Sequence, residues 1–490
     1  MDLTEEQLNI IEASKALKSE QKLKIDACAG SGKTSTLVEI AKANPDKKYL
    51  YLAFNKAIVE EAKNRFPKNV DVKTTHSLAY GAVIAKQKKK TNIISKLRFY
   101  DLEKYFSATP KELITLLSDY DNFLNSDKED FKKYENKDSL KRLYELQDSG
   151  ILPMTHSFYL KKYSLGQNNL DKKYDAIFLD EAQDTNPVTF SIFNRNLCAK
   201  ILVGDTHQNI YNFRGSYNSL KSEKADIVMN LSNSFRTPKK IISQANYFLK
   251  HYAYDDNFVS MNSLADHSNE INSVAFLSRT NSALIKYMIL NEDDIKKIKL
   301  TRTPDSIFKT ALNVLNFDKK RFNLLDSEFY FLKKFNDLDE VDDYAKNAKD
   351  VELSSAIKLV MAFGSALDYI YEKCATFHLD KNDNAEITLS TIHSSKGLEF
   401  DEVTIDSNFI NIAKEDYLTY TDFSLEELRE LEKNGIAPMS ETDFQQELNL
   451  YYIALTRAKK KLNDETVNSE NYEAFPFRKP QYNLKVDCLF

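Results

Sequence analysis

The sequence is poor in cysteine, glycine and proline, and it contains no tryptophan. Its 490 residues include four cysteines, ten glycines and ten prolines. Because Cys28, Cys198, Cys374 and Cys488 are widely separated, they form neither a CxxC metal pair nor an iron–sulfur run, and we expect reduced, mostly buried thiols. The scarcity of glycine and proline leaves little room for flexible tethers, and no repeat of fixed period is visible.

Long hydrophobic runs are missing too. No apolar run approaches the roughly 18 residues that a membrane-spanning helix needs, and the first residues, MDLTEEQ, are acidic where a signal peptide is basic. We therefore expect a cytoplasmic protein that contacts no membrane. With 42% hydrophobic and 29% charged residues, the composition is that of globular domains. The net charge of −5 does not indicate nucleic-acid binding, so any such surface must be local.

Predicted strands and helices alternate in two long stretches of the chain. This rhythm is typical of parallel sheets covered by helices on both faces. We therefore predict an α/β fold with two parallel-sheet cores, each interrupted by a mainly helical insertion, the first of which shows no strand signal. We also expect residues 445–460 to form one helix. The predicted boundaries are 1–84 and 169–227 for the first core, 85–168 for its insertion, 228–303 and 385–490 for the second core with its C-terminal tail, and 304–384 for its insertion.

The segment IDACAGSGKTSTL, from Ile25 to Leu37, has the pattern of a phosphate-binding loop. A strand opens into a Gly-rich turn and then a helix, which presents backbone N–H groups and a helix N-terminus to phosphate. Ala27 stands where the usual pattern has its first glycine, so a Gly-rich surface loop is the alternative for this motif taken alone. Within this segment, Lys33 supplies a positive charge for the phosphates, and Thr34 supplies a hydroxyl for Mg²⁺. The predicted nucleotide contacts are Ala29, Gly30, Ser31, Gly32, Lys33, Thr34 and Ser35.

A second motif, IFLDEAQDTNP, begins far downstream at Ile177. The apolar strand 176–179 delivers Asp180 and Glu181, of which one carboxylate would hold Mg²⁺ through water and the other would orient the attacking water. A solvated acidic turn is the alternative for this motif alone. Because the two motifs occur in the right order and each follows a predicted strand, we predict that the chain binds and hydrolyses a nucleoside triphosphate, with Thr34 and Asp180 as metal ligands.

Several further motifs follow one another in a characteristic order: LTEEQLNII, YLAFNKA, TTHSLAY, GDTHQNIYNFRG, LSNSFRT, STIHSSKGLEF and YYIALTRAKK. This series closely resembles the superfamily 1A DNA helicases of the UvrD, Rep and PcrA type. The AFNK and THSLAY motifs are similar to those of the F-box DNA helicase branch and its small bacterial and phage relatives. The resemblance implies two RecA-like cores with ATP and Mg²⁺ at their interface. It also implies translocation along single-stranded DNA, with 3′→5′ unwinding of DNA that bears a 3′ tail.

The resemblance also assigns roles around the nucleotide. Gln7 would hydrogen-bond the edge of adenine, although a solvated residue of an N-terminal helix is the alternative. Phe235 would stack on adenine, and Glu399 would lie near the ribose and triphosphate. Gln208 would sense the γ-phosphate after a strand end. The same resemblance makes Arg236 and Arg457 arginine fingers from the second core, where a surface ion pair is the usual alternative for an arginine.

DNA contacts are implied in the same way. Base–aromatic stacking tolerates any sequence, which suits a motor that passes over every base. The alternative is that the aromatic rings are core residues and the histidines structural. A Lys-rich stretch, KQKKKTNIISKLR, is either a backbone contact or a solvated face. The residues assigned to DNA are Asn55, His76, Tyr211, Phe213, Arg214 and His393.

Rival functions remain open at this point. An ATP-gated regulator, or the motor subunit of a repair or anti-phage defence complex, would hydrolyse ATP on DNA but unwind little. A P-loop kinase or GTPase fits poorly, because it has no use for Arg236, Arg457 and the aromatic-rich motif. About 30 residues follow YYIALTRAKK, so we expect any nuclease to be a separate partner, as a repair protein would be. We expect a monomer.

Overall fold

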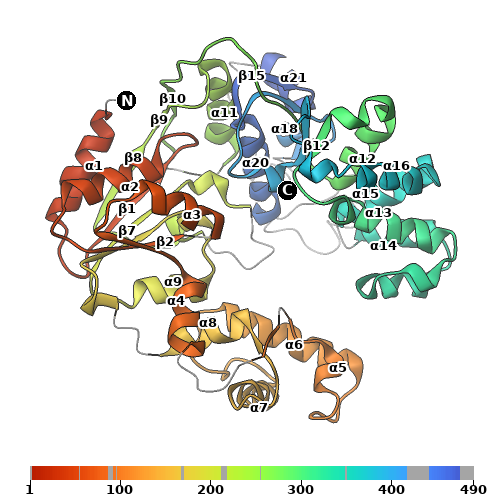
Figure 1. Ribbon diagram of the computed structural model, residues 1–490, viewed down its shortest axis with the longest axis horizontal. Helices are drawn as coiled ribbons and strands as arrows, with labels where there is room; N and C mark the ends of the chain where they lie inside the picture. Colours follow the sequence, from red (N-terminus) through yellow and green to blue (C-terminus); the bar gives the residue numbers. More distant parts are fainter. Residues whose placement is uncertain are drawn as a thin grey trace, which may run out of the picture. The chain divides into compact units, whose positions relative to one another are not determined.

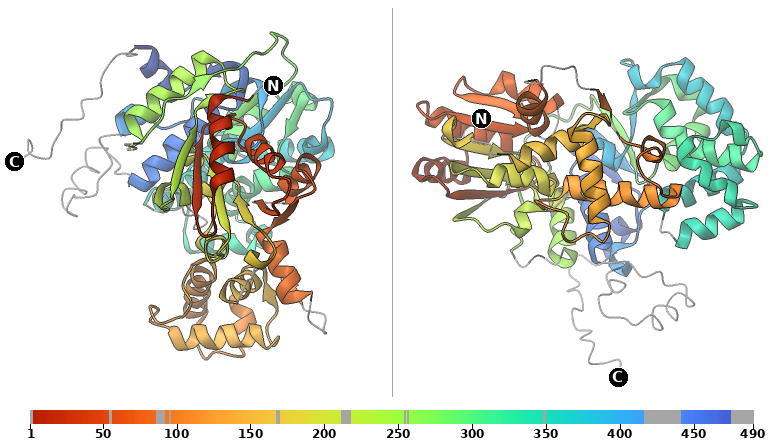
Figure 2. Two further views of the ribbon diagram at one scale, coloured as in Figure 1. Left: turned by 90° about the vertical axis from the view of Figure 1, so that its left-hand side faces the viewer. Right: turned by 90° about the horizontal axis from the view of Figure 1, so that it is seen from below.

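The structure is a computed structural model, shown in Figure 1 and Figure 2. It describes residues 3–53, 56–85, 92–94, 96–166, 170–210, 218–253, 255, 257–347, 350–415 and 441–474. The chain divides into two units, Met1–Asn233 and Ser234–Phe490, and each is described by itself. Each unit contains one large parallel sheet with helices, so the predicted α/β class with two parallel-sheet cores is confirmed.

The sheet of the first unit has six strands, all paired in parallel. Three of them, near the middle, are buried along their whole length, as the continuous apolar runs of a sheet covered on both faces require. The spatial order is β3 (Val70–Thr74), β2 (Tyr49–Ala53), β6 (Ala176–Leu179), β7 (Ala199–Gly204), β1 (Lys22–Ala27) and β8 (Ile227–Leu231).

Helices cover both faces of this sheet, and the alternation along β2 shows how. Tyr49 and Tyr51 pack into one hydrophobic cluster, whereas Leu50 and Leu52 pack into another on the opposite face. The first face carries α1 (Glu5–Ala16), α2 (Lys33–Ala43) and α3 (Lys56–Arg65), and the second carries α9 (Pro187–Asn194) and α10 (Ser219–Ser222), as can be followed in Figure 1.

The end of the first core differs from the prediction. We predicted that this core ends at residue 227, but residues 227–231 form β8, which pairs with β1 from Leu23 to Ala27. The predicted boundary cuts the run IVMNL after its first residue, because the pattern of this run does not show which of the two sheets it joins. Pairing with β1 therefore extends the first sheet to Leu231.

The first insertion is mainly helical, and it gathers beside α9, away from the sheet (Figure 1). Its long helix α6 starts with a capping box, in which Thr109 and Glu112 bond each other's backbone N–H groups. Contrary to expectation, the insertion also contains a two-residue parallel pair, β4 (Ile93–Ile94) with β5 (Met154–Thr155). Two residues are too few to produce an alternating pattern. The helices of the insertion are α5 (Phe99–Leu102), α6 (Pro110–Asn125), α7 (Lys137–Asp148) and α8 (His156–Leu165), and α4 (Thr75–Ala79) lies before it, directly after β3.

The second unit contains a five-stranded parallel sheet. Its spatial order is β12 (Ile298–Leu300), β13 (Ile387–Thr391), β11 (Val274–Ser278), β14 (Phe400–Ile405) and β15 (Ala458–Asp464). The helices that accompany it are α11 (Lys239–Tyr252), α12 (Asn281–Leu290), α17 (Ile392–Ser395), α18 (Ile412–Glu415), α20 (Glu441–Leu455) and α21 (Val467–Ala474).

Residues 445–460 do not form one helix, as we predicted. Helix α20 ends at Leu455, and β15 begins at Ala458. The run AKKKLND has little intrinsic preference for a strand. It pairs with β14 at the edge of the sheet, where Lys459 and Lys460 each lie 3.3 Å from Asp401. Tertiary pairing therefore overrides the local helical pattern.

The second insertion is helical and includes the amphipathic run SSAIKLVMAFGSALDYIYEK, residues 354–373. This run is broken at Gly364, where φ is 48°, so it forms two helices. Among the described residues no single helix is long and apolar enough to cross a membrane, although the pair Val351–Phe363 and Ala366–Lys381, bent by 105°, passes that test together. Both helices contribute buried residues to the core of the unit. The helices are α13 (Pro304–Asp318), α14 (Leu338–Asn347), α15 (Val351–Phe363) and α16 (Ala366–Thr376).

Candidate active site

A backbone cradle connects β1 to α2 in the first unit. Gly30 and Gly32 have φ values of 72° and 79°, a left-handed conformation that glycine adopts without strain. Gly32 is the N-cap of α2 and offers no side-chain hydrogen bond. The first N–H groups of α2 therefore have no side-chain cap, and together with the helix dipole they form an anion site.

Ser31 supplies an independent observation that fits an anion at this turn. Its side chain is 2% exposed, and its hydroxyl has no hydrogen-bond partner in the protein. A buried hydroxyl without a partner is costly unless a ligand satisfies it. Because it lies inside the uncapped turn, a phosphate oxygen fits this position.

The two carboxylates predicted from the second motif lie beside this cradle. Asp180 is 5% exposed, and its Oδ2 accepts hydrogen bonds from Thr34 Oγ1 at 3.1 Å and from Tyr51 OH at 2.5 Å. Glu181 Oε1 lies 3.5 Å from Lys33 Nζ. The fold thus brings Lys33, Thr34 and both acidic residues together. Tyr51, in the middle of an apolar strand, carries no sequence signal for this contact.

Burial raises the pKa of Asp180, and the neighbouring negative charge of Glu181 raises it further. A cation placed between Thr34 and Asp180 would reverse this effect. A hydroxyl and a carboxylate are oxygen ligands of the kind that Mg²⁺ prefers, and Mg²⁺ usually takes few ligands from the protein. Among the described residues there is no group of three or more His, Cys, Asp or Glu that could hold a metal ion.

Two glutamines predicted to touch the nucleotide are engaged in other contacts. Gln7 is the third residue of a capping box with Thr4, and its amide donates to Thr36 Oγ1 at 3.1 Å. Gln7 would have to give up these contacts to hydrogen-bond the edge of adenine. Gln208 follows β7, as predicted, and its amide donates to Asp205 Oδ2 at 2.7 Å. The hydroxyl of Ser35 accepts a hydrogen bond from Arg65 at 2.8 Å.

The second unit holds the two predicted arginine fingers in different ways. Arg236 Nε lies 2.7 Å from Glu399 Oε2, an ion pair without hydrogen-bond geometry, and Phe235 precedes it at intermediate exposure. Arg457 is 1% exposed, and its guanidinium donates to the carbonyl oxygens of Ile453 and Leu398, both at 3.0 Å. Both guanidinium groups are therefore bound within their own unit.

Of the predicted DNA contacts, two lie within the described residues. His76 is exposed on α4, with the rings of His156 and Tyr159 at 6.4 and 6.1 Å. Partial desolvation among these rings, with a contribution from His156, lowers the pKa of His76. His393 lies on α17, directly after β13. Four others, Asn55, Tyr211, Phe213 and Arg214, lie outside the described residues.

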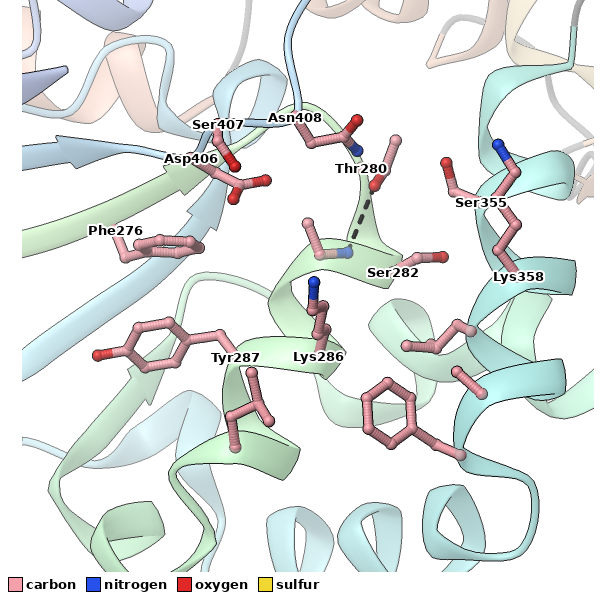
Figure 3. A pocket seen from close by; sticks show the side chains of 15 residues that line it. Phe276, Thr280, Ser282, Lys286, Tyr287, Ser355, Lys358, Asp406, Ser407 and Asn408 are labelled. Carbon is pink, nitrogen blue, oxygen red and sulfur yellow. Dashed lines mark hydrogen bonds between the residues drawn. The ribbon is translucent and has the colours of Figure 1, made fainter. Parts of the chain in front are cut away.

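A cavity of about 840 Å³ lies elsewhere, in the second unit between α12, α15 and the segment after β14. Figure 3 shows Lys286 rising from α12 toward this space, with Asp406 and Asn408 approaching from the other side. None of the predicted site residues that the structure describes lines it. The cavity is therefore separate from the phosphate cradle.

Comparisons with known proteins agree with this geometry. A family model of the UvrD/REP helicase N-terminal domain matches residues 107–226, and one of the UvrD-like helicase C-terminal domain matches residues 190–464. The second match covers more than half of the chain. The chain belongs to the UvrD-like helicase family, which confirms the family that its motifs resemble.

Individual relatives carry consistent names. The F-box DNA helicase 1 of Gallus gallus is 30% identical, and the match covers 94% of this chain and 48% of that protein. The F-box DNA helicase protein 1 of Schizosaccharomyces pombe is 29% identical over 94% of this chain and 57% of that protein. The chain thus spans about half the length of these two relatives. A putative ATP-dependent DNA helicase of Bacillus subtilis, YjcD, is 21% identical over 93% of this chain and 78% of that protein.

The raised pKa of Asp180 leads to a test by thermal unfolding. Since the folded pKa of Asp180 exceeds the unfolded one, the stability that this carboxyl group contributes is lost as the pH rises through the folded pKa, and a neutral side chain avoids that loss. We expect Asp180→Asn to raise the Tm of the ligand-free protein by about 2–4 °C, which corresponds to roughly 1 kcal/mol. The same variant should lose the Mg²⁺-dependent rise in Tm that a non-hydrolysable ATP analogue produces in the wild type.

Asp71→Asn is the matched control. Hydrogen bonds from Lys173 and Tyr174 lower the pKa of Asp71, so its ionised form stabilises the fold and its loss should leave the Tm unchanged or lower it. If Asp180→Asn lowered the Tm in the same way and kept the Mg²⁺ response, Asp180 would be a structural residue only.

Proposed function

We propose that this protein is an ATP-dependent single-stranded DNA translocase and DNA helicase, which hydrolyses ATP at the interface of its two RecA-like units. The observation that carries the proposal is the convergence of Lys33, Thr34, Asp180 and Glu181 on the uncapped N-terminus of α2. Family membership and the names of the relatives support DNA as the substrate.

In this proposal each residue of the cradle has a separate task. Lys33 and the N–H groups of α2 neutralise the phosphates, and Thr34 with Asp180 would hold Mg²⁺, which supplies charge neutralisation at the β- and γ-phosphates. Glu181 orients the attacking water. Its backbone has a φ of 50°, an uncommon conformation for a residue with a side chain, and its carboxylate lies 3.5 Å from Lys33 Nζ.

The second unit would complete the site. Arg236 is partly exposed, and a triphosphate offers more negative charge than the single carboxylate of Glu399, so Arg236 would exchange Glu399 for the γ-phosphate. Arg457 would first have to release its carbonyl partners. Each exchange makes hydrolysis depend on the state of the second unit, which is how closure around ATP would be coupled to a changed grip on the DNA strand.

Substitutions in the cradle separate binding from turnover. Lys33→Ala should weaken ATP binding, because it removes a charge from the phosphates. Glu181→Gln should keep ATP binding and lose turnover. Each should lower the ATPase rate by about 10²-fold or more. Matched controls are Lys42→Ala and Glu39→Gln, an exposed ion pair on the same helix. Wild-type rates in either cradle variant would refute the assignment.

Polarity needs its own experiment, since only the family motifs indicate a 3′→5′ direction. We expect ATP-dependent unwinding of a duplex with a 3′ single-stranded tail, weakened steeply by salt because the grip is on phosphates. The measurement is strand displacement on 3′- and 5′-tailed duplexes of identical sequence. Efficient unwinding from the 5′ tail alone would overturn the direction. ATP hydrolysis on DNA without any displacement would instead indicate a translocase or a motor subunit that does not unwind.

A further inference from the structure

Gln183 is a buried residue to which the function proposed above assigns no role. It lies in the short 3₁₀ turn Ala182–Asp184, directly after the catalytic carboxylates, and its side chain is 0% exposed. Its amide Nε2 donates to Glu181 Oε2 at 2.6 Å, and its Oε1 accepts the backbone N–H of Asp205 at 3.1 Å. Both ends of one carboxamide are therefore used, on two different segments.

The hydrogen bond from Gln183 and the ion pair with Lys33 involve different oxygen atoms of the Glu181 carboxylate. Lys33 lies nearest to Oε1 of Glu181, at 3.5 Å, whereas Gln183 binds Oε2. The carboxylate is thus fixed from both sides, by an ammonium of the phosphate cradle and by a neutral amide of its own turn. Since the backbone of Glu181 is in the left-handed region, with φ 50°, neighbouring contacts have to hold it there.

The other contacts of Gln183 lead to the segment after β7. Its backbone carbonyl accepts a hydrogen bond from the Asn209 side chain, and Asp205, which it bonds, also binds Gln208. This segment continues directly into residues 211–217, which contain the aromatic residues predicted to stack on DNA. Gln183 therefore joins the water-orienting carboxylate to the segment that leads to the predicted DNA contacts.

Close packing leaves this link little freedom. A Cβ added at Gly204 would lie 2.1 Å from Gln183 Oε1, 2.8 Å from Leu220 Cδ1 and 3.0 Å from the backbone N of Ala182. Gly204 is at the end of β7, and no side chain fits there while Gln183 holds its position. A movement of the segment after β7 would consequently move the carboxamide, and with it Glu181.

We propose that Gln183 is a positioning residue that holds the Glu181 carboxylate for water activation and transmits to it the state of the segment after β7, so that DNA binding raises the rate of ATP hydrolysis. This inference rests on the function proposed above. Gln183 touches neither ATP nor DNA in this account. It acts through the orientation of Glu181, and its loss should therefore affect turnover and not the affinity for ATP.

Two substitutions test the proposal. Gln183→Met keeps the approximate volume and removes both hydrogen bonds. Gln183→Glu keeps an acceptor for Asp205 but replaces the donor facing Glu181 with a second carboxylate. For both we expect the KM for ATP to stay within about twofold of the wild type. The kcat with single-stranded oligodeoxythymidylate should fall by about 10- to 100-fold, and the ratio of the rates with and without DNA should fall toward one.

Ser219→Ala is the matched control, because it removes a buried hydrogen bond to the carbonyl of Ala182 in the same turn without touching Glu181. It should keep both kcat and the stimulation by DNA. Thermal unfolding of each variant checks the fold. If Gln183→Met does not fold, the result for Gln183→Glu alone tests the proposal. Wild-type kcat and stimulation in Gln183→Glu would overturn the proposal, as would an equal loss in Ser219→Ala. A wild-type protein without ATPase activity would instead overturn the function on which it rests.

Discussion

The buried carboxylate of Asp180 beside the N-terminus of α2 is the group around which the candidate active site is arranged. The parallel strands β1 and β6 end at the same edge of the sheet. That edge brings together Thr34 and Asp180, which are 146 residues apart in the chain and share a hydrogen bond. Burial and the negative charge of Glu181 raise the pKa of Asp180, which makes its ionised form costly in this position. In the proposed function a divalent cation bound with a triphosphate would offset this cost, which is a physical reason for binding both together.

A second constraint is that several residues predicted to contact the nucleotide already have partners within their own unit. Gln7 is bound in its capping box, Arg236 lies against Glu399, and Arg457 donates to backbone carbonyls. In the proposed mechanism these partners are exchanged for the nucleotide during each cycle. In the proposed function, competing contacts of this kind would keep hydrolysis low until the nucleotide and the DNA strand are bound.

The sequence predicted the parts of the site that consecutive residues encode. The Gly-rich turn and the run AIFLDE each combine a strand with the residue types that phosphate and Mg²⁺ require, so Lys33, Thr34, Asp180 and Glu181 could be found without coordinates. Contacts between distant segments could not. Nothing local shows that β8 joins β1, that Tyr51 binds Asp180, or that Gly204 is needed because Gln183 packs against it. The roles assigned to Asn55, Tyr211, Phe213 and Arg214 remain predictions from the family motifs.

The central claim is that the triphosphate site of the first unit works under the control of a DNA strand. The most direct measurement is the ATPase rate of the purified chain with Mg²⁺, with and without single-stranded DNA, at low and at moderate salt. The account predicts a rate that rises by about 10-fold or more with DNA and a stimulation that fades with salt, since the strand is held by its phosphates. An ATPase rate indifferent to DNA, or no hydrolysis under any of these conditions, would contradict it.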